Sequence, residues 1–176
     1  MSAANEQSFL KSIFFGQIKE DIIFPYPKPN AEISENVSMI LDSIDRFGKD
    51  VVKAAAWDDA AAMPREVIDQ MAEMGLTGLG VPEEFGGLGL PQSGYARVMQ
   101  QVASLDGSLA VTLGAHQSIG YKCLLLFGND EQKKRFLPRL ASGKMLAAFC
   151  LTEPSSGSDA ASIQTKAELS ADGKHY

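Results

Sequence analysis

The chain has few of the residues that mark secreted, metal-binding or membrane-spanning proteins. It contains two cysteines among 176 residues, Cys123 and Cys150, and their spacing matches no metal-ligand motif. Both lie among apolar residues, so we expect reduced thiols, no disulfide framework and no metal site. The sequence also lacks a run of about 18 apolar residues, and its N-terminus lacks a basic segment followed by an apolar core. These absences predict a cytoplasmic protein.

Positive charge is scarce as well. Lysine and arginine total 16 against 22 aspartates and glutamates, which gives a formal net charge of -6. The one dense basic cluster is Lys133-Lys134-Arg135, which we expect on the solvated face of a helix. Nucleic-acid binding requires clustered basic side chains that meet phosphates, so the composition argues against this function class.

One segment has the pattern of a helix that meets a lipid surface. Between Phe9 and Phe24 apolar residues recur at helical spacing, namely Leu10, Ile13, Phe14 and Ile18. A lipid surface and the protein's own body are both compatible with such a stripe, and packing on the protein is the commoner use. We therefore expect this segment to pack on the protein, and the sequence leaves membrane association open.

Motifs of nucleotide-binding and hydrolytic enzymes are missing. The run Gly86-Gly87-Leu88-Gly89 lacks the G-x-G-x-x-G spacing and follows Pro82-Glu83-Glu84 rather than a β-strand. We expect a tight interhelical turn with positive φ there, not a phosphate site. No G-x-S-x-G elbow occurs, which argues against hydrolysis. His116 has no titratable neighbour at helical spacing, so we expect a hydrogen-bonded core or edge residue.

The composition is that of an ordinary globular protein, with 45% hydrophobic and 22% charged residues, and the chain is long enough for a substantial core. Hydrophobic periodicity predicts helices at 33–51, 64–75, 95–105, 109–127 and from 130 onward. Asn30 and Asn129 are the expected N-caps. The first helix, whose apolar positions cover 33–51, is expected to continue to a loose end near Trp57, and Pro138 is expected to interrupt the last.

The segment 109–127 is apolar on most sides, so we expect it at the centre of a helical bundle. Small side chains gather along it, at Gly114, Ala115, Gly120 and Cys123. Such residues permit close packing of helices, and they also leave room for a ligand beside the helix. Close packing is the interpretation we favour.

The most informative segment lies near the end of the chain. Residues 146–151 are apolar without interruption and predict a buried strand, after which polarity switches on at Thr152. Pro154 and Gly157 take the following backbone out of regular structure. Free N–H groups and hydroxyls in such a loop suit the carbonyls of a polar ring or the oxygens of a phosphate. The hydroxyls are those of Thr152, Ser155, Ser156 and Ser158. A surface turn with an aspartate cap is the alternative, and chemistry alone leaves both open.

A β-domain is expected to begin around this loop. Beyond it, Thr165, Ala167 and Leu169 alternate with charged residues, which is the period of a half-buried strand. Asp172-Gly173 is a strong hairpin-turn signal.

The loop resembles the flavin-contacting signature of acyl-CoA dehydrogenases, a strand that enters a Thr-Glu-Pro-x-x-Gly-Ser-Asp loop, here Thr152–Asp159. The resemblance continues at residues 81–90, 114–120, 131–138, 140–143 and 161–167. Together with the opening segments 8–11 and 24–27, several of these pieces are similar to the very-long-chain branch of the family. The resemblance runs from Ser8 to Tyr176, nearly the whole chain.

The resemblance implies a mainly α fold, with an amino-terminal helical bundle of the acyl-CoA dehydrogenase type followed by the first strands of a truncated middle β-domain. It divides the chain into an amino-terminal extension (1–30), a helical domain (31–143) and the incomplete start of the β-domain (144–176). The family's catalytic base is a glutamate of a later domain. We therefore expect the base beyond residue 176 and assign no catalytic residue in this chain.

FAD is the cofactor that the resemblance implies. The residues assigned to it are Phe149, Cys150, Leu151, Thr152, Glu153, Pro154, Ser155, Ser156, Gly157 and Ser158. Among these, Leu151 and Thr152 would donate near the pyrimidine edge of the flavin. Ser158 would lie near the pyrophosphate and would also bind the substrate's pantetheine chain. Glu153 is expected to hold the loop's shape or to form an ion pair.

The implied reaction is α,β-dehydrogenation of a long-chain or very-long-chain fatty acyl-CoA, as in fatty acid β-oxidation. Gly120 and Cys123 would line the acyl pocket. A homodimer and an electron-transferring flavoprotein as acceptor are implied by the same resemblance. A different class of function also stays open: a catalytically inactive helical module, or one half of a split enzyme that binds a partner subunit.

Overall fold

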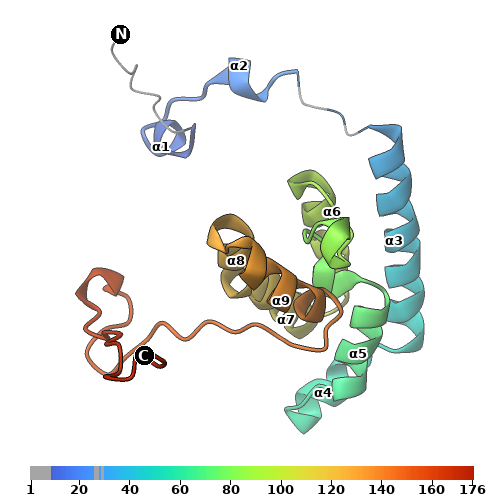
Figure 1. Ribbon diagram of the computed structural model, residues 1–176. Helices are drawn as coiled ribbons and strands as arrows, with labels where there is room; N and C mark the ends of the chain where they lie inside the picture. The colour runs from blue at the N-terminus through green and yellow to red at the C-terminus, as the bar shows by residue number, and fades with distance from the viewer. Residues whose placement is uncertain (1–8, 26–27, 29) are drawn as a thin grey trace.

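The computed structural model describes residues 9–25, 28 and 30–176, and the regular structure there is helical, which confirms the mainly α prediction (Figure 1). Ser8, where the resemblance begins, and residues 26, 27 and 29 lie outside the described residues. The α-helices are α1 (Phe9–Phe14), α2 (Glu20–Ile23), α3 (Ala31–Asp50), α4 (Ala54–Ala60), α5 (Arg65–Glu73), α6 (Gln92–Leu105), α7 (Gly107–Ala115), α8 (Lys122–Phe127) and α9 (Asp130–Ala141). The π-helix η3 (His116–Gly120) joins α7 to α8, and short 3-10 helices are η1 (Leu76–Gly78), η2 (Glu83–Phe85) and η4 (Ala160–Ser162).

Both predicted N-caps are confirmed. The Asn30 side chain accepts a hydrogen bond of 2.7 Å from the backbone N–H of Ile33 at the start of α3. Asn129 forms a full capping box on α9, because its side chain accepts from the N–H of Gln132 at 2.8 Å while the Gln132 side chain accepts from the N–H of Asn129 at 2.9 Å. Local signals therefore set these two helix starts.

Two predicted helix ends are wrong. The chain does not fray near Trp57, because α3 ends at Asp50 and a separate short helix, α4, follows. The bend between them lets Trp57 and Met63 pack against the core. Pro138 does not interrupt α9, although it removes one backbone donor. Leu137 and Leu140, which flank it, are buried, and their burial offsets the lost hydrogen bond.

The predicted helix at 109–127 is present as a continuous path but not as one α-helix. Five residues in its middle adopt π geometry, the segment η3. The segment is central as predicted, since Leu109, Leu113 and Tyr121 are buried. A π turn inserts one extra residue into a helix, and such turns are frequent at functional sites. Here it coincides with two adjacent buried polar residues, His116 and Gln117.

The bundle has two apolar clusters. In the larger one α3 packs on α6 and α6 on α7, with Ile44, Met71 and Leu109 fully buried. The smaller cluster joins the inner side of α9 to the turn after η1, and it contains Val81 and Leu137. The two clusters meet along η3, which contacts α7, α8 and η1. This junction is where the polypeptide leaves the bundle toward the predicted cofactor loop.

The Gly86-Gly87-Leu88-Gly89 run is an interhelical turn, as predicted. Gly86 and Gly89 have φ of +81° and +57°, which glycine adopts without strain. A Cβ on Gly87 would lie 2.1 Å from the carbonyl oxygen of Val81, so only glycine fits there. The turn is therefore explained by packing and backbone conformation.

The predicted strands are not formed in the described part of the chain. Residues 146–151 run extended without a partner strand, and the isolated bridge recorded there joins Glu153 to Ser156. Phe149 is 54% exposed and Leu151 39%, so the prediction of a buried strand is wrong. A strand requires a neighbour to pair its backbone groups, and no described segment runs beside this one. The predicted turn at Asp172-Gly173 is formed, and the N–H of Ser170 donates across it to the carbonyl oxygen of His175 at 2.8 Å, but no described residue beside it belongs to a strand.

The opening segment lies apart from the bundle in Figure 1. Large apolar residues of α1 and its flanks are exposed, including Phe14 at 89% and Ile18 at 68%, so within the described residues the expected packing on the protein's own body is not seen. None of the described helices has the length and apolarity that a bilayer crossing demands.

Candidate functional site

The loop predicted to hold a cofactor is built around a tight turn. The backbone N–H of Glu153 donates to the carbonyl oxygen of Ser156 at 2.9 Å, and the N–H of Ser156 donates back to Glu153 at 3.1 Å. Pro154 lies at the second position of this turn, where its fixed φ is favourable. The turn thereby gives the loop a defined shape without any neighbouring strand.

The carboxylate of Glu153 is the organising group of the loop. It accepts hydrogen bonds from the backbone N–H groups of Gln164 and Thr165 at 2.6 and 3.0 Å, and from the Thr165 hydroxyl. These bonds, led by the Thr165 hydroxyl and the Gln164 amide, lower the pKa of Glu153. The expected loop-shaping role is confirmed, and among the described residues no cation forms an ion pair with this side chain.

Two of the four loop hydroxyls are committed to the loop itself. Ser155 donates to the Glu153 carboxylate at 3.3 Å, and buried Ser156 donates to the carbonyl oxygen of Asp159. Within the described residues, the hydroxyls of Thr152 and Ser158 make no hydrogen bond and are exposed. They remain available to a ligand, whereas the sequence had suggested four equivalent hydroxyls.

Unpaired backbone donors precede the turn. Among the described residues, the N–H groups of Leu151 and Thr152 have no hydrogen-bond partner, and both residues are exposed. Phe149 and Cys150, the first residues assigned to the cofactor, are exposed as well. The donor set of the loop thus fits the acceptor atoms of a flavin ring and a phosphate, which require N–H and O–H groups free of internal bonds.

His116 connects this loop to the bundle. Its Nδ1 accepts a hydrogen bond of 3.0 Å from the backbone N–H of Ala147, and its Nε2 lies 3.1 Å from the carbonyl oxygen of Leu140. The side chain is 2% exposed and meets the ring of Tyr121 edge-on. Burial lowers the pKa of His116, which keeps the ring neutral. The prediction of a hydrogen-bonded core histidine is confirmed.

Among the small residues of the central helix, as we call the continuous path α7–η3–α8, Gly120 is tightly packed, whereas a Cβ on Gly114 would meet only Met99 at 3.7 Å. A Cβ on Gly120 would lie 2.7 Å from the Cβ of Ala147, so this glycine lets the chain that enters the loop approach the helix. The thiol of Cys123 donates to the Gly120 carbonyl oxygen at 3.4 Å. Cys123 and Cys150 are free and exposed, so the apolar surroundings expected for them are wrong. For Gly120 the geometry favours close packing, the interpretation preferred from the sequence.

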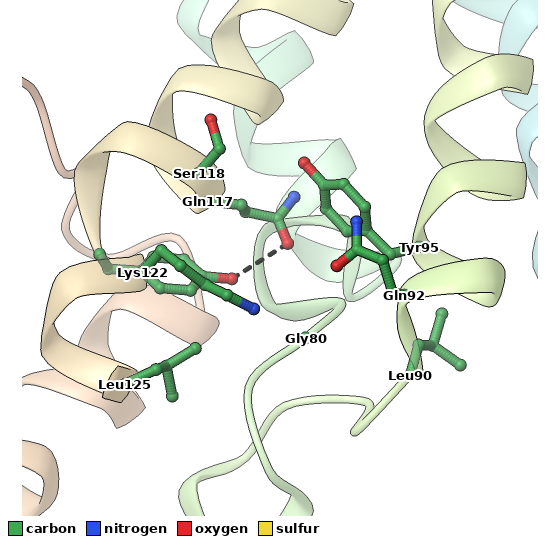
Figure 2. A pocket seen from close by; sticks show the side chains of 9 residues that line it. Gly80, Leu90, Gln92, Tyr95, Gln117, Ser118, Lys122 and Leu125 are labelled. Carbon is green, nitrogen blue, oxygen red and sulfur yellow. Dashed lines mark hydrogen bonds between the residues drawn. The ribbon is translucent and has the colours of Figure 1, made fainter. Parts of the chain in front are cut away.

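An open pocket of about 390 Å³ lies on another side of the central helix (Figure 2). The residues that line it are Gly80, Leu90, Gln92, Tyr95, Gln117, Ser118, Tyr121, Lys122 and Leu125. Figure 2 shows Gln117 and Lys122 extending toward it from the central helix and Tyr95 from α6. Burial raises the pKa of Tyr95. Gly120 and Cys123 do not line this pocket.

A buried polar network behind the pocket was not predicted. The Gln117 side chain donates to the carbonyl oxygen of Leu76 at 2.8 Å and accepts from the N–H of Leu79 at 3.0 Å. The Tyr121 hydroxyl lies 3.0 Å from Gln117 and 3.2 Å from the carbonyl oxygen of Thr77. Burial raises the pKa of Tyr121. Gln117 and Tyr121, one helical turn apart in a mostly apolar segment, were the signal that could have located this network, because buried polar groups require partners.

The described residues contain no group of three or more His, Cys, Asp or Glu side chains placed to hold a metal ion.

Comparison with known proteins gives a consistent result. Residues 34–144 match the model of the acyl-CoA dehydrogenase, N-terminal domain. The chain is 47% identical over 174 residues to the very long-chain specific acyl-CoA dehydrogenase, mitochondrial, of Macaca fascicularis, covering 98% of this chain and 27% of that protein. It thus spans about a quarter of the length of the curated relatives it matches.

Solved structures agree. An acyl-CoA dehydrogenase complexed with FAD from Bacillus anthracis has a TM-score of 0.75 and 37% identity, covering 92% of this chain and 27% of that one. A structure described as the electron transferring flavoprotein of Acidaminococcus fermentans has a TM-score of 0.73 and 32% identity, covering 85% of this chain and 38% of that one. The chain belongs to the acyl-CoA dehydrogenase family and is similar to the amino-terminal portion of its very-long-chain members.

Proposed function

We propose that this chain is the amino-terminal part of an FAD-dependent acyl-CoA dehydrogenase that acts on long-chain or very-long-chain fatty acyl-CoA. The observation that carries the proposal is that some polar groups of the loop bond within it while others stay free. Glu153, Ser155 and Ser156 bond within the loop, while the N–H groups of Leu151 and Thr152 stay free. Preformed free donors beside a rigid turn are suited to a polar cofactor. The names of the similar proteins support the substrate class.

In this proposal three loop residues bind the ligands. The backbone N–H groups of Leu151 and Thr152 bind the carbonyl edge of the flavin ring, where negative charge accumulates on reduction. The Ser158 hydroxyl binds the pyrophosphate and the pantetheine chain of the substrate. Bound FAD supplies the hydride acceptor, and the protein supplies position and polarity.

The catalytic base is proposed to be a glutamate in the part of the relatives that this chain does not span. Glu153 is the carboxylate closest to the free donors in sequence, but its oxygens are occupied by three neighbouring residues. Those bonds favour the ionised form and tie it to the loop backbone, so its geometry suits a structural role rather than proton abstraction. A homodimer is proposed as the assembly, and an electron-transferring flavoprotein as the electron acceptor.

The test is anaerobic titration of the native gene product, purified with its flavin, with palmitoyl-CoA. We expect the oxidised flavin absorbance to bleach. Ser158→Ala should lower flavin affinity by about tenfold or more, since hydrogen bonds to charged groups contribute about 1.5–3 kcal/mol. Ser155→Ala is the matched control and should retain flavin. Absence of flavin in the native product, or equal losses in both variants, would contradict the proposal.

A partner-binding role is the second candidate, and the exposed apolar segment favours it. Leu146, Phe149 and Leu151 are 36%, 54% and 39% exposed on an extended backbone that lacks a paired neighbour. A second polypeptide that adds strands here would cover them. In that case the 176-residue chain with FAD would not react with palmitoyl-CoA alone and would gain activity only with the partner. Activity that resides in one polypeptide contradicts the split arrangement.

A further inference from the structure

His116 lies where the bundle passes into the segment that enters the loop. Ala147 is the last residue before the loop with a recorded hydrogen bond to the bundle, through its N–H to His116 Nδ1 at 3.0 Å. Among the described residues, 148–152 make no hydrogen bond to any helix. The direction in which the chain enters the loop is therefore set at Ala147.

The two bonds of His116 fix its tautomer. Because Nδ1 accepts the N–H of Ala147, the ring proton must be on Nε2, which donates to the carbonyl oxygen of Leu140. A proton added at Nδ1 would turn the acceptor into a donor that faces another donor. The ring thus holds Ala147 only in its neutral form.

The surroundings of the ring contain no compensating charge. The ring lies against the ring of Tyr121, the backbone of η1 at Thr77, the carbonyl oxygen of Leu140 on α9, and Ala147. Tyr121 is the titratable group in this set, and it stays neutral because burial raises its pKa. The closed packing of Gly120 against Ala147 keeps the contact tight.

We propose that His116 is a positioning residue: in its neutral Nε2–H form it holds Ala147, and through Ala147 it aims the free donors of the cofactor loop, whereas protonation releases that segment. The consequence for cofactor binding rests on the proposed function, but the hold on Ala147 does not. Since burial disfavours the charged ring, we expect the segment at Ala147 to be released at pH values below the ordinary histidine pKa of about 6.5.

Two variants separate positioning from simple core packing. His116→Asn places a carbonyl oxygen near the former Nδ1 and retains an acceptor for the Ala147 N–H. His116→Gln places an amide nitrogen near the former Nε2 and retains the donor to Leu140 but not the acceptor. A purely structural core role treats the two alike, whereas the positioning role requires them to differ.

The first experiment measures the hydrogen-exchange protection factor of the Ala147 amide in the native gene product by mass spectrometry with residue-level fragmentation. We expect His116→Gln to lower it by about tenfold, the size of one hydrogen bond, and His116→Asn to retain it. In the unmodified chain it should fall as pH decreases below about 6.5, and in His116→Asn it should not. Equal protection in both variants, or a pH-independent wild type, would overturn the inference. Where His116→Gln fails to fold, the comparison of wild type with His116→Asn across pH decides.

The second experiment measures FAD dissociation from the flavin-loaded native protein as a function of pH. We expect weaker binding in His116→Gln at neutral pH and a loss of wild-type affinity on acidification that His116→Asn lacks. Matching affinities in both variants would overturn the link to the cofactor. A wild type that never binds FAD contradicts the proposed function instead, and the Ala147 measurement still decides the hold itself.

Discussion

Different forces stabilise the helical bundle and the segment that follows it. In the bundle, apolar side chains such as Ile44 and Met71 are fully removed from water, and most of the stability comes from that burial. From residue 148 onward large apolar side chains are exposed, and the order comes from hydrogen bonds centred on Glu153. The bundle contains its own core, whereas the segment has shape without a core and offers unpaired donors and apolar surface.

The two regions meet at a short junction. Gly143 has φ of +68°, and a Cβ there would lie 2.4 Å from the Cβ of Ala72 on α5. Four residues later, Ala147 bonds to His116. The junction therefore depends on both forces: Gly143 is held by close packing, and Ala147 is held by a hydrogen bond to a buried side chain.

The largest effect is expected from a change inside the bundle. Ile44→Ala removes a fully buried side chain of α3 and should lower the free energy of unfolding by about 2–5 kcal/mol. Leu169→Ala, in the segment and 56% exposed, should change it by no more than about 0.5 kcal/mol. Urea unfolding followed by fluorescence of Trp57 measures both. Similar losses would mean that the segment shares the bundle's core.

The junction should be nearly as sensitive. Gly143→Ala meets both backbone strain and a clash, so we expect a loss of about 2–4 kcal/mol. Gly86→Ala is the matched control within the bundle, because Gly86 also has a positive φ, +81°, but has open space around it, and it should cost about 1–2 kcal/mol at most. Thermal unfolding of the two variants separates the clash from the strain. A loss for Gly143→Ala no larger than that for Gly86→Ala would show that the junction is loosely packed.

A moderate effect is expected at the start of α9. Asn129→Ala removes the capping box and should destabilise the chain by about 1 kcal/mol. Asn36→Ala, at an exposed site within α3, lacks such a bond and serves as the control. Chemical denaturation measures the difference. Equal stabilities would mean that tertiary packing alone holds α9.

The smallest effect on global stability is expected in the loop. The lowered pKa of Glu153 means that its bonds persist above the ordinary glutamate pKa and are lost as pH falls through the lower folded-state value. Glu153→Gln should raise amide exchange at Gln164 and Thr165 while unfolding of the bundle stays unchanged. Ser170→Ala, which bonds only near the hairpin turn, is the control. A cooperative loss of bundle stability in Glu153→Gln would contradict the separation of the two regions.

The sequence predicted best where a structure depends on neighbouring residues. Asn30 and Asn129 were predicted correctly as the N-caps of their helices, and the position of Glu153 before Pro154 indicated its structural role. The sequence predicted the structure less well where contacts between distant segments determine it. The continuation of α9 through Pro138 depends on burial of both flanks, which periodicity alone does not weigh.

In the candidate site, too, the sequence predicted the features that depend on neighbouring residues and missed those that depend on the folded structure. The motif placed the donors of Leu151 and Thr152 in one loop, but it did not show that Ser155 and Ser156 bond within that loop. The bond between His116 and Ala147 spans 31 positions of sequence, so no local pattern contains it. The domain limits at residues 30 and 143 stay predictions.

The most direct test is native mass spectrometry of the gene product isolated from its own cells. The account predicts a polypeptide that contains this sequence, has a mass well above 18.9 kDa and carries one non-covalent FAD. A stable product of 18.9 kDa without bound flavin would contradict the claim that the exposed loop is the cofactor-binding part of a dehydrogenase.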